Sequence, residues 1–594
     1  MKQQLLFVLQ VLLFTVGEVS LVSCTTVSWT QQQVNGTLSC PPGYVPGPKE
    51  SSACECGHWP NSVVVCDEAT VKAYILVGYC MTYNDVKNET VTGKCPYSYY
   101  RNDSLKFYIP LPEYLSTLNE FMCGNSLNRT GELCGTCKSN FTVPLFMYAS
   151  NFKCVECTEN SYNWLIYTGV EFIPVTVFFI AVVLFSINIT SPSMNSLIFF
   201  SQISTAGISS SFLDIHNFVT QQGSSPLPHS EVVPHILHHA YSIWNLDFFR
   251  FHFLYSPLCF DGMSTVHVRS MAYITALYPL FLVVLLYICI KLHNCNFRPL
   301  VRCWKPFHKC WVHYRRRVDP KAKVIDAFAT FLLLTHVKLM LVSYDLLTTT
   351  QLYKGDGKEL NSPSLYYDAT VQIFQGQHLP FGIIAVLILA TFTALPPLFL
   401  LMYPTKIFQK FLVCINFSPP QLHAFADVFT GCYKDGISSG NYDMRFIAGA
   451  YYVLRIVILS ASLFEPTTYI VTSIFVYILT AMFFALMKPY KNNFYNVLDA
   501  LMFALLSMIY TAILYHILYI TVTSKNSIVL VVLTEVLAAL PLLYELGLII
   551  WWFIRKSAKC LHKYGLLQLQ IEKRDVPLPD RLISSEDEEY KPLL

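Results

Sequence analysis

Long apolar runs recur from residue 163 onward, with polar segments between them. Each run is close to the roughly twenty residues that a helix needs to cross about 30 Å of hydrocarbon. The pattern predicts an all-α membrane domain over residues 163–554. Its nine expected spans are 164–188, 195–213, 270–292, 325–347, 380–403, 446–463, 467–487, 496–522 and 528–554. Serines dilute the second run, so a re-entrant segment stays open there.

Basic residues in the connecting loops indicate the orientation, because cytoplasmic loops carry an excess of Lys and Arg. Loop 294–324 has nine basic residues against one acid, whereas loop 214–269 has two against four. Nine spans place the first loop inside and the second outside, together with a cytoplasmic tail at 555–594. Dropping the second span outright would invert every later loop. We therefore expect nine spans, or eight with a re-entrant pair of the same sidedness.

The first residues form a short basic region followed by an apolar run from Leu5 to Val16. A run of about a dozen residues is too short to span, and it is typical of a cleaved secretory signal. We predict a signal peptide over residues 1–23; an uncleaved anchor is the alternative. Either reading sends the next segment into an oxidising compartment.

Residues 24–160 combine many cysteines with several glycosylation sequons and few long apolar periods. Cysteine density in a secreted segment indicates a disulfide framework whose connectivity the sequence does not give. We predict a small ectodomain rich in β-strands and loops. The expected disulfide cysteines are Cys40, Cys54, Cys56, Cys66, Cys80, Cys95, Cys123, Cys134, Cys137, Cys154 and Cys157. The expected glycosylation sites are Asn35, Asn88, Asn102, Asn128 and Asn140.

Two Cys-x-x-Cys motifs, Cys134 to Cys137 and Cys154 to Cys157, have the spacing of a zinc ribbon. The sequons around them favour a secreted setting. We therefore expect two small-loop disulfide crosslinks in place of a metal site. Cys259, in an outside loop, is available as a partner if cleavage removes Cys24 and leaves an odd count.

Composition supports a membrane protein and narrows its partners. Charged residues make up 13% of the 594 residues, about half of the roughly 25% in soluble domains. The net charge of +3 does not favour a nucleic-acid partner. No motif typical of an enzyme is present, and we predict neither a catalytic residue nor a bound metal or cofactor. The predicted partners are the lipid bilayer and an extracellular ligand of unknown chemistry.

Ionisable residues inside the spans are the main functional candidates, because a charge at bilayer depth is costly. We expect Glu535 to face inward beside Lys338 or Arg455, which would place the ninth span next to the fourth or the sixth. Such charges either line a polar path or form salt bridges that hold the bundle together. The full candidate set is Lys338, Arg455, Glu535, Glu545 and Asp499.

Three other patterns have competing interpretations. Pro396-Pro397 in the fifth span indicates either a broken helix lining a cavity or a packed kink. The histidines from His235 to His239 could bind a metal or sense pH, and an ordinary polar loop is favoured. A cytoplasmic segment from Cys303 to His313 interleaves zinc-ligand types with aromatics, which favours a basic segment at the membrane surface.

The end of the tail overlaps two sorting patterns, a tyrosine-based signal and an acidic dileucine signal. Sorting adaptors are therefore candidate partners at this end. The residues concerned are Glu589, Tyr590, Leu593 and Leu594.

The stretch from Glu132 through Cys157 to Trp164 resembles a group of uncharacterised animal surface proteins, in which a cysteine-rich ectodomain precedes a multi-pass domain. The stretch from Lys488 to Asp499 loosely resembles the TRP-like membrane domain of fungal multi-pass proteins. The second resemblance implies cation permeation or lipid handling, and it transfers no filter or catalytic residue to this chain.

Two functions fit these patterns. The first is a protein of the plasma membrane or endolysosome, with its N-terminus outside, that couples an extracellular recognition module to a channel- or transporter-like domain. The second is a receptor or adhesion protein whose bundle is an anchor and whose cytoplasmic loop and tail signal or sort. Intramembrane Lys338 and Arg455 favour the first, and the long ectodomain favours the second.

Overall fold

The computed structural model describes strand segments between residues 29 and 108, residues 123, 128–143 and 154–156, and most of the chain from 163 to 563. Within that last stretch it leaves out 186–189, 206–239, 247–262, 295–319, 355–358, 361, 415–419, 437–441, 462–465 and 524–527. The signal segment, the tail with its sorting residues, His235 to His239 and Cys303 to His313 all lie outside the described residues.

Each predicted span overlaps a helix of the structure, and the described ends differ from the predicted ones by up to nine residues. A further helix, without a label in the figures, covers residues 192–205. The labelled helices of the membrane domain are α3 (Asn163–Phe185), α6 (Thr265–Asn294), α9 (Pro320–Leu347), α10 (His378–Ile388), the π-helix η8 (Leu389–Ala394), α11 (Leu395–Met402), α14 (Ile447–Ala461), α15 (Pro466–Met487), α16 (Asn493–Thr523) and α17 (Ile528–Lys563).

Five of these helical stretches are long and apolar enough to cross a membrane, which fits a membrane protein. They are Thr265–Lys291, Val324–Leu347, His378–Met402, Tyr469–Met487 and Asn493–His516. Shorter apolar helices cover Tyr167–Val183, Ile447–Ala461 and Val532–Tyr544. Two more helices, α12 (Lys406–Cys414) and α13 (Pro420–Thr430), lie between α11 and α14. They occupy the expected cytoplasmic loop.

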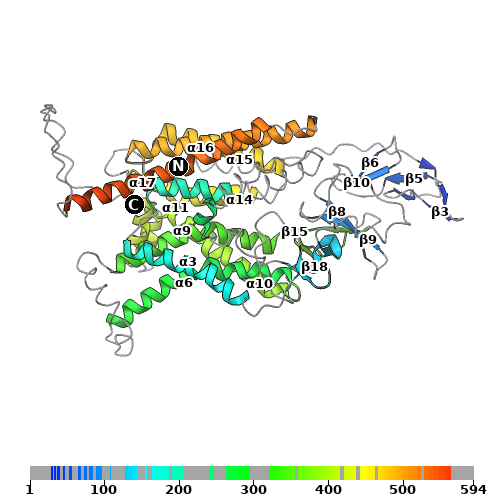
Figure 1. The fold of residues 1–594 in the computed structure, drawn as a ribbon, viewed down its shortest axis with the longest axis horizontal. Coiled ribbons are helices and arrows are strands. Elements are labelled where there is room, and N and C mark those ends of the chain that lie inside the picture. The colour runs from blue at the N-terminus through cyan, green and yellow to red at the C-terminus, as the bar shows by residue number, and fades with distance from the viewer. Residues whose placement is uncertain are drawn as a thin grey trace.

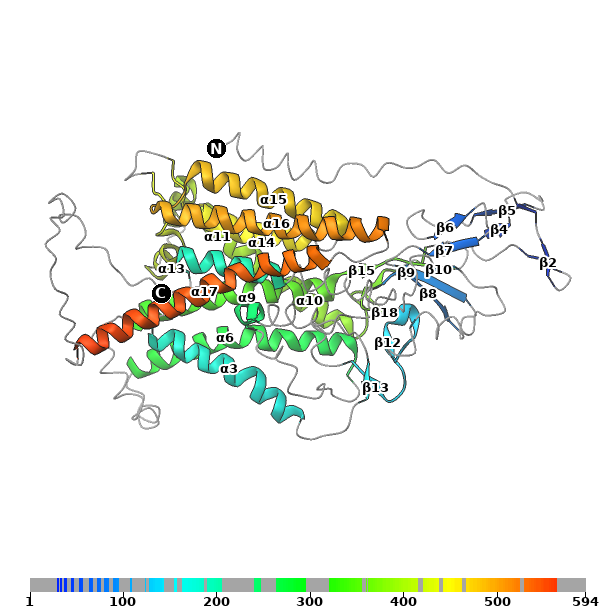
Figure 2. The same cartoon turned by 45° about the horizontal axis from the view of Figure 1, so that its top comes forward.

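The long helices run side by side, and the small sheets lie beyond one end of the bundle (Figures 1 and 2). Burial separates a central helix from peripheral ones. In the most apolar stretch of α9, 78% of residues are buried inside the protein, against 22% for α15. The outward side chains of α15 are large and apolar, including Phe475 and Met482. This distribution is the one expected of a bundle whose outer helices face lipid.

Helix 192–205 is buried, and its polar side chains point into the protein. Ile198, Phe200 and Gln202 are fully buried, and Ser196 and Ser201 are almost so. Within the described helix, the serines that dilute this run are therefore buried inside the protein and do not face lipid. The helix ends at 205 in the described residues, eight positions before the predicted end at 213.

Part of loop 214–269, expected to be an outside polar loop, packs among the helices. Its residues 240–246 include the 3₁₀ turn η5 (Ile243–Asn245). The Tyr241 hydroxyl donates a hydrogen bond to the carbonyl of Ala538 in α17, and its ring lies 5.7 Å from that of Phe200. Apolar burial explains the correction, because Tyr241 and Leu246 are almost fully buried. The count of charged residues averages over the whole loop, so it does not reveal that the short segment 240–246 packs between helices.

The N-terminal region forms small antiparallel sheets, as the β-rich expectation requires. Three are β1–β5–β4, β10–β7–β6 and β2–β3. Their strands are β1 (Trp29–Thr30), β2 (Gln32–Val34), β3 (Thr37–Ser39), β4 (Tyr44–Pro46), β5 (Ala53–Cys56), β6 (Val64–Asp67), β7 (Lys72–Ile75) and β10 (Phe107–Tyr108). Two short hairpin pairs follow, β11 (Arg129–Thr130) with β12 (Thr136–Cys137) and β13 (Phe141–Thr142) with β14 (Val155–Glu156).

One sheet joins the N-terminal region to the membrane domain. It has the order β8 (Tyr79–Asn84), β9 (Glu89–Lys94), β16 (Leu352–Lys354). Strand β16 follows the C-terminal end of α9, and Tyr353 pairs with Thr92 of β9. The chain between α9 and α10 also forms β15 (Thr349–Thr350), β17 (Ser364–Leu365) and β18 (Asp368–Gln372). The chain between α9 and α10 is therefore joined to the sheets of the N-terminal region.

Close backbone approach fixes this junction at two glycines. A Cβ on Gly93 would lie 2.8 Å from Leu133 Cδ1 and 3.0 Å from the carbonyl oxygen of Gln351. A Cβ on Gly135 would lie 2.9 Å from the amide nitrogen of Ala369. Both contacts join the N-terminal region to the α9–α10 loop, so side chains at these positions would separate the two parts.

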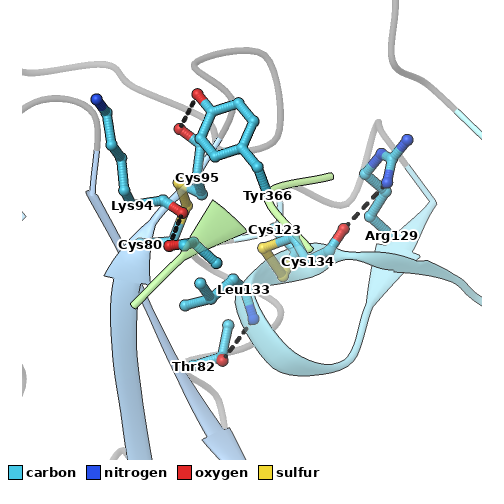
Figure 3. Close-up of a disulfide and its surroundings, with 10 residues drawn as sticks. Cys80, Thr82, Lys94, Cys95, Cys123, Arg129, Leu133, Cys134 and Tyr366 are labelled. Carbon is cyan, nitrogen blue, oxygen red and sulfur yellow. Dashed lines mark hydrogen bonds between the residues drawn. A yellow bond between two sulfur atoms is a disulfide. The ribbon is translucent and has the colours of Figure 1, made fainter. Parts of the chain in front are cut away.

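Three disulfides are formed among the described cysteines: Cys80–Cys95, Cys123–Cys134 and Cys137–Cys154. Figure 3 shows the first two beside Leu133, whose amide donates to the Thr82 hydroxyl at 2.9 Å. The expectation of a small loop within each Cys-x-x-Cys motif is wrong. Cys134 ends a 3₁₀ turn and Cys137 lies in the extended strand β12, so the two side chains reach different partners.

Candidate functional site

A fully buried arginine, Arg455, lies at the centre of the helical bundle on α14. Its Nε donates to Gln202 Oε1 at 3.0 Å, and its Nη2 donates to Asn195 Oδ1 at 3.2 Å. Its Nη1 donates to the Tyr451 carbonyl at 3.4 Å. The guanidinium carbon also lies 4.9 Å from the centre of the Phe199 ring. Amide oxygens and aromatic faces thus surround the charge.

Gln202 connects this arginine to the central helix. Its Nε2 donates to the carbonyls of Leu333 and Leu334 in α9, at 3.2 Å each. Its Oε1 is then left to accept from Arg455. Because both ends of the buried amide are used, the contact holds helix 192–205 between α9 and α14 in one register.

A buried carboxylate, Asp499 of α16, lies beside Tyr451, which is one helical turn before Arg455 on α14. The hydroxyls of Tyr451 and Tyr490 both donate to Asp499 Oδ2, the second at 2.8 Å. Asp499 is fully buried near the start of α16. Its other oxygen, Oδ1, has no hydrogen-bond partner among the described residues. Asp499 therefore bonds to tyrosines, and Arg455 bonds to amides.

The tyrosine cluster extends out of the bundle to the loops expected to be cytoplasmic. Tyr490 lies between α15 and α16, and Tyr433 follows α13. The two form an antiparallel bridge, their rings stack at 4.7 Å, and their hydroxyl oxygens are 3.3 Å apart. Burial raises the pKa of Tyr433 and of Tyr490 well above the usual value of 10.0. Both hydroxyls stay protonated, so a chain of exchangeable protons joins Tyr433 to Asp499.

On the other side of Arg455 the network reaches the π-helix η8 between α10 and α11. The ring of His336, in α9, lies 4.8 Å from the ring of Tyr452. Its Nε2 lies 3.3 Å from the carbonyl oxygen of Thr393, inside the π-helix η8. In a regular α-helix that carbonyl would accept from residue 397, which is Pro397 and has no N–H. His336 supplies the missing donor.

The remaining sequence candidates are placed differently from the expectation. Glu535 lies on α17, half-buried, and α17 packs along α16 instead of α9 or α14. One carboxylate oxygen of Glu535 has no partner, and neither Lys338 nor Arg455 pairs with it in the described part of the chain. The expected pairing is wrong because the 240–246 segment reaches α17 at Ala538 and α17 stays peripheral.

Two further candidates, Lys338 and Glu545, have individual outcomes, and a third charged residue of the helices, Asp345, forms an ion pair. Lys338 is buried on α9, 8% exposed. The side chain of Glu545, within α17, lies outside the described part. Asp345, an acid near the outer end of α9, pairs with Arg269 of α6, and the Arg269 guanidinium covers the Tyr367 ring at 3.5 Å.

The sequons and remaining cysteines are only partly described. Asn140 is exposed, whereas Asn128 is half-buried and its Nδ2 donates to the carbonyl of Cys154 at 3.2 Å. Asn35, Asn88 and Asn102 lie outside the described residues, as do Cys40 and Cys157. Cys54, Cys56 and Cys66 fall in described strands, but their side chains do not.

The sequence did not single out the amides and tyrosines that hold the two buried charges. Gln202 and Asn195 stand in the serine-diluted second run, and that dilution was their only signal. In the described part of the chain, no group of three or more His, Cys, Asp or Glu side chains is placed to hold a metal. The geometry is that of an enclosed hydrogen-bond network.

Comparison with models of known protein families finds no match, and searches against curated proteins and solved structures find none either. The resemblances to animal surface proteins and to the fungal TRP-like domain therefore stay predictions.

Proposed function

We propose that this is a nine-span membrane protein, with its N-terminus outside, in which an extracellular recognition module controls a channel- or transporter-like helical domain. The observation that carries the proposal is the pairing of β16 with β9. The outer end of α9 thereby continues into the ectodomain sheet. A module held only by a flexible stalk would lack this second connection.

Helix α9 leads into strand β16 and also contributes groups to the buried hydrogen-bond network around Arg455. Helix α9 runs from the ectodomain junction to the bundle centre, where the carbonyls of Leu333 and Leu334 bind Gln202 and the His336 imidazole binds Thr393. A shift of α9 would act on both contacts at once. Ligand binding to the ectodomain can thus bias the arrangement of buried polar groups through packed elements.

The break in the fifth span supports a transport function. Helix α10 changes into the π-helix η8 immediately before Pro396-Pro397 and continues as α11. The chain stays helical through this stretch but changes its hydrogen-bond pattern, and π-bulges are frequent at functional sites. Two half-helices joined at such a break can move relative to each other.

One observation favours the alternative, a receptor or adhesion protein. Arg455 is fully buried, and its guanidinium donates to Gln202, Asn195 and the Tyr451 carbonyl. A bundle that only anchors the ectodomain would also enclose its charges in this way. The alternative gives the cytoplasmic loop and tail the signalling or sorting role.

Liposome reconstitution distinguishes the two functions. The full chain would be assayed for cation flux and for lipid scrambling, with Thr92→Cys and Tyr353→Cys combined to crosslink β9 to β16. We expect flux above empty liposomes, and we expect crosslinking to alter it, with recovery on reduction. Each single cysteine variant and reductant-treated wild type are the controls. If no variant conducts ions or scrambles lipid, the transport function is wrong and the receptor or adhesion function replaces it.

A tag test checks the proposed sidedness independently. Tags near Tyr314 and after Leu594 should be protected from protease added outside intact cells, and a tag near Gly357 should be cleaved. Cleavage at Tyr314 would overturn the nine-span topology.

A further inference from the structure

A hollow of about 440 Å³ opens on the outer surface of the bundle between α15 and α16, at the end that bears the α15–α16 turn. Its walls are apolar and are formed by Met482, Ala485, Val497 and Leu501, among others. All four of these side chains are exposed. Ala481 of α15 and Ala500 of α16 also line the hollow, and their small side chains leave the space between the two helices unfilled. An apolar hollow on a lipid-facing surface is suited to a hydrocarbon chain.

Polar groups lie at the end of the hollow nearest the turn. Lys488 and Asn493 line it, and both side chains are exposed. Lys488 directly follows the end of α15, where a lysine reaches the headgroup region of a bilayer. The hollow therefore combines an apolar slot with a cation and an amide at headgroup depth. That combination matches an anionic phospholipid.

The turn that carries Lys488 is held rigidly. The Tyr490 amide donates to Asn496 Oδ1 at 2.9 Å, and Asn496 Nδ2 donates back to the Tyr490 carbonyl at 3.3 Å. The Lys491 ammonium donates to the carbonyl of Gly431 at 3.0 Å, which fastens the turn to the end of α13. Lys491 is thus occupied by protein, whereas Lys488 points to the hollow. A pre-formed site avoids the ordering cost of binding.

We propose that the α15–α16 hollow binds one anionic phospholipid, with an acyl chain between the helices and the headgroup phosphate on Lys488 and Asn493. With the orientation given under Proposed function, the bound lipid lies in the cytoplasmic leaflet, so this one detail rests on that proposal. Binding itself does not depend on that orientation or on transport. Failure of the flux assay and failure of lipid binding are therefore separate results.

Native mass spectrometry of the full chain in detergent provides the test, with phosphatidylserine and phosphatidylcholine of identical acyl chains as probes. Lys488→Asn removes the charge, and asparagine tolerates the left-handed backbone at this position, where φ is 45°. We expect the preference for phosphatidylserine to fall about fivefold. Lys410→Asn, an exposed lysine on α12, is the matched control and should leave the preference unchanged.

A second variant tests the apolar slot. Ala485→Trp fills the hollow, and we expect it to weaken binding of both lipids, whereas Leu486→Trp, a 74% exposed position outside the lining, should not. Equal effects of Lys488→Asn and Lys410→Asn would show attraction by bulk charge and overturn the site. Undiminished lipid binding in Ala485→Trp would also overturn the site. So would a spectrum in which Ala485→Trp abolishes a dimer peak and leaves the lipid-bound peak unchanged, because the hollow would then hold a second copy of the chain.

Discussion

The His336 imidazole lies 3.3 Å from the carbonyl oxygen of Thr393, the group that Pro397 leaves without its helical donor. The two residues are on different helices, and both are buried. The Nδ1 atom of His336 has no hydrogen-bond partner among the described residues. The bond therefore needs the tautomer protonated at Nε2. It joins the central helix to the broken one at a point where a backbone group would otherwise be unsatisfied.

His336→Leu should destabilise the protein, because it leaves a buried carbonyl unpaired at a cost of about 1–3 kcal/mol. Pro397→Ala restores an N–H to the position that serves Thr393. In that background we expect His336→Leu to cost about 1 kcal/mol less, measured by thermal unfolding in detergent. Pro396→Ala is the control, because its new N–H would serve Phe392 instead. An equal cost of His336→Leu in all three backgrounds would contradict the role of this bond.

Gln202→Glu should cost less stability while Arg455 is present than in its absence, because a carboxylate then takes the place of the amide oxygen at 3.0 Å from Arg455 Nε, although the change removes the Nε2 donor to the Leu333 and Leu334 carbonyls. Combined with Arg455→Leu, the same change leaves a lone charge at bilayer depth, costing about 2.5–3.5 kcal/mol on insertion scales. We expect the double variant to express less folded protein than Arg455→Leu alone, measured by size-exclusion chromatography of a fluorescent fusion. Gln202→Leu in the same background controls for loss of the amide.

Helix positions could be predicted from the sequence because apolar length is a local property that the bilayer thickness imposes. Asp499 was likewise recognisable as a candidate, since a charge inside a predicted span is costly. Its tyrosine partners were not, because which helices touch depends on packing that no single run encodes. Glu535 illustrates the limit: charge balance suggested a partner for Arg455, but two amides in helix 192–205 fill that place.

The N-terminal region shows the same limit for cysteines. Their density predicted disulfides, and three are formed. The pairing Cys137–Cys154 joins the two Cys-x-x-Cys motifs to each other, because strand geometry decides which side chains meet. The contribution of β16 from residues 352–354 was also outside the reach of the sequence pattern, since β-pairing is set by distant partners.

Glycan occupancy should differ between the two described sequons. Asn140 is exposed, whereas the Asn128 Nδ2 atom, to which a glycan would attach, is used in a bond to Cys154. We expect Asn140→Gln to remove one full glycan and Asn128→Gln to remove little, measured as mass shifts before and after glycosidase treatment. Equal losses from both variants would show that the Asn128 contact forms only after glycosylation or not at all.

Acid should stabilise the ectodomain junction through Asp368. Burial raises the pKa of this carboxyl above 3.8, although hydrogen bonds from Thr370 and Thr265 and the charge of Arg129 act in the opposite direction. Because the folded state binds the proton more tightly than the unfolded state, the stabilisation is complete below the ordinary pKa. It is lost as the pH rises through the folded value.

Asp368→Asn keeps an oxygen to accept the 2.5 Å bond from the Thr370 hydroxyl and cannot ionise. We therefore expect hydrogen exchange of peptides covering 364–372 to slow on acidification in the wild type, after correction for the intrinsic rate, and to lose this dependence in Asp368→Asn. Asp443→Asn is the control, because it removes a carboxyl whose pKa is shifted in the opposite direction. Burial raises the Asp443 pKa, but the Arg445 hydrogen bonds outweigh burial and lower it, so its stabilisation is lost on acidification instead. A junction that loosens in acid would show that the Arg129 charge dominates Asp368.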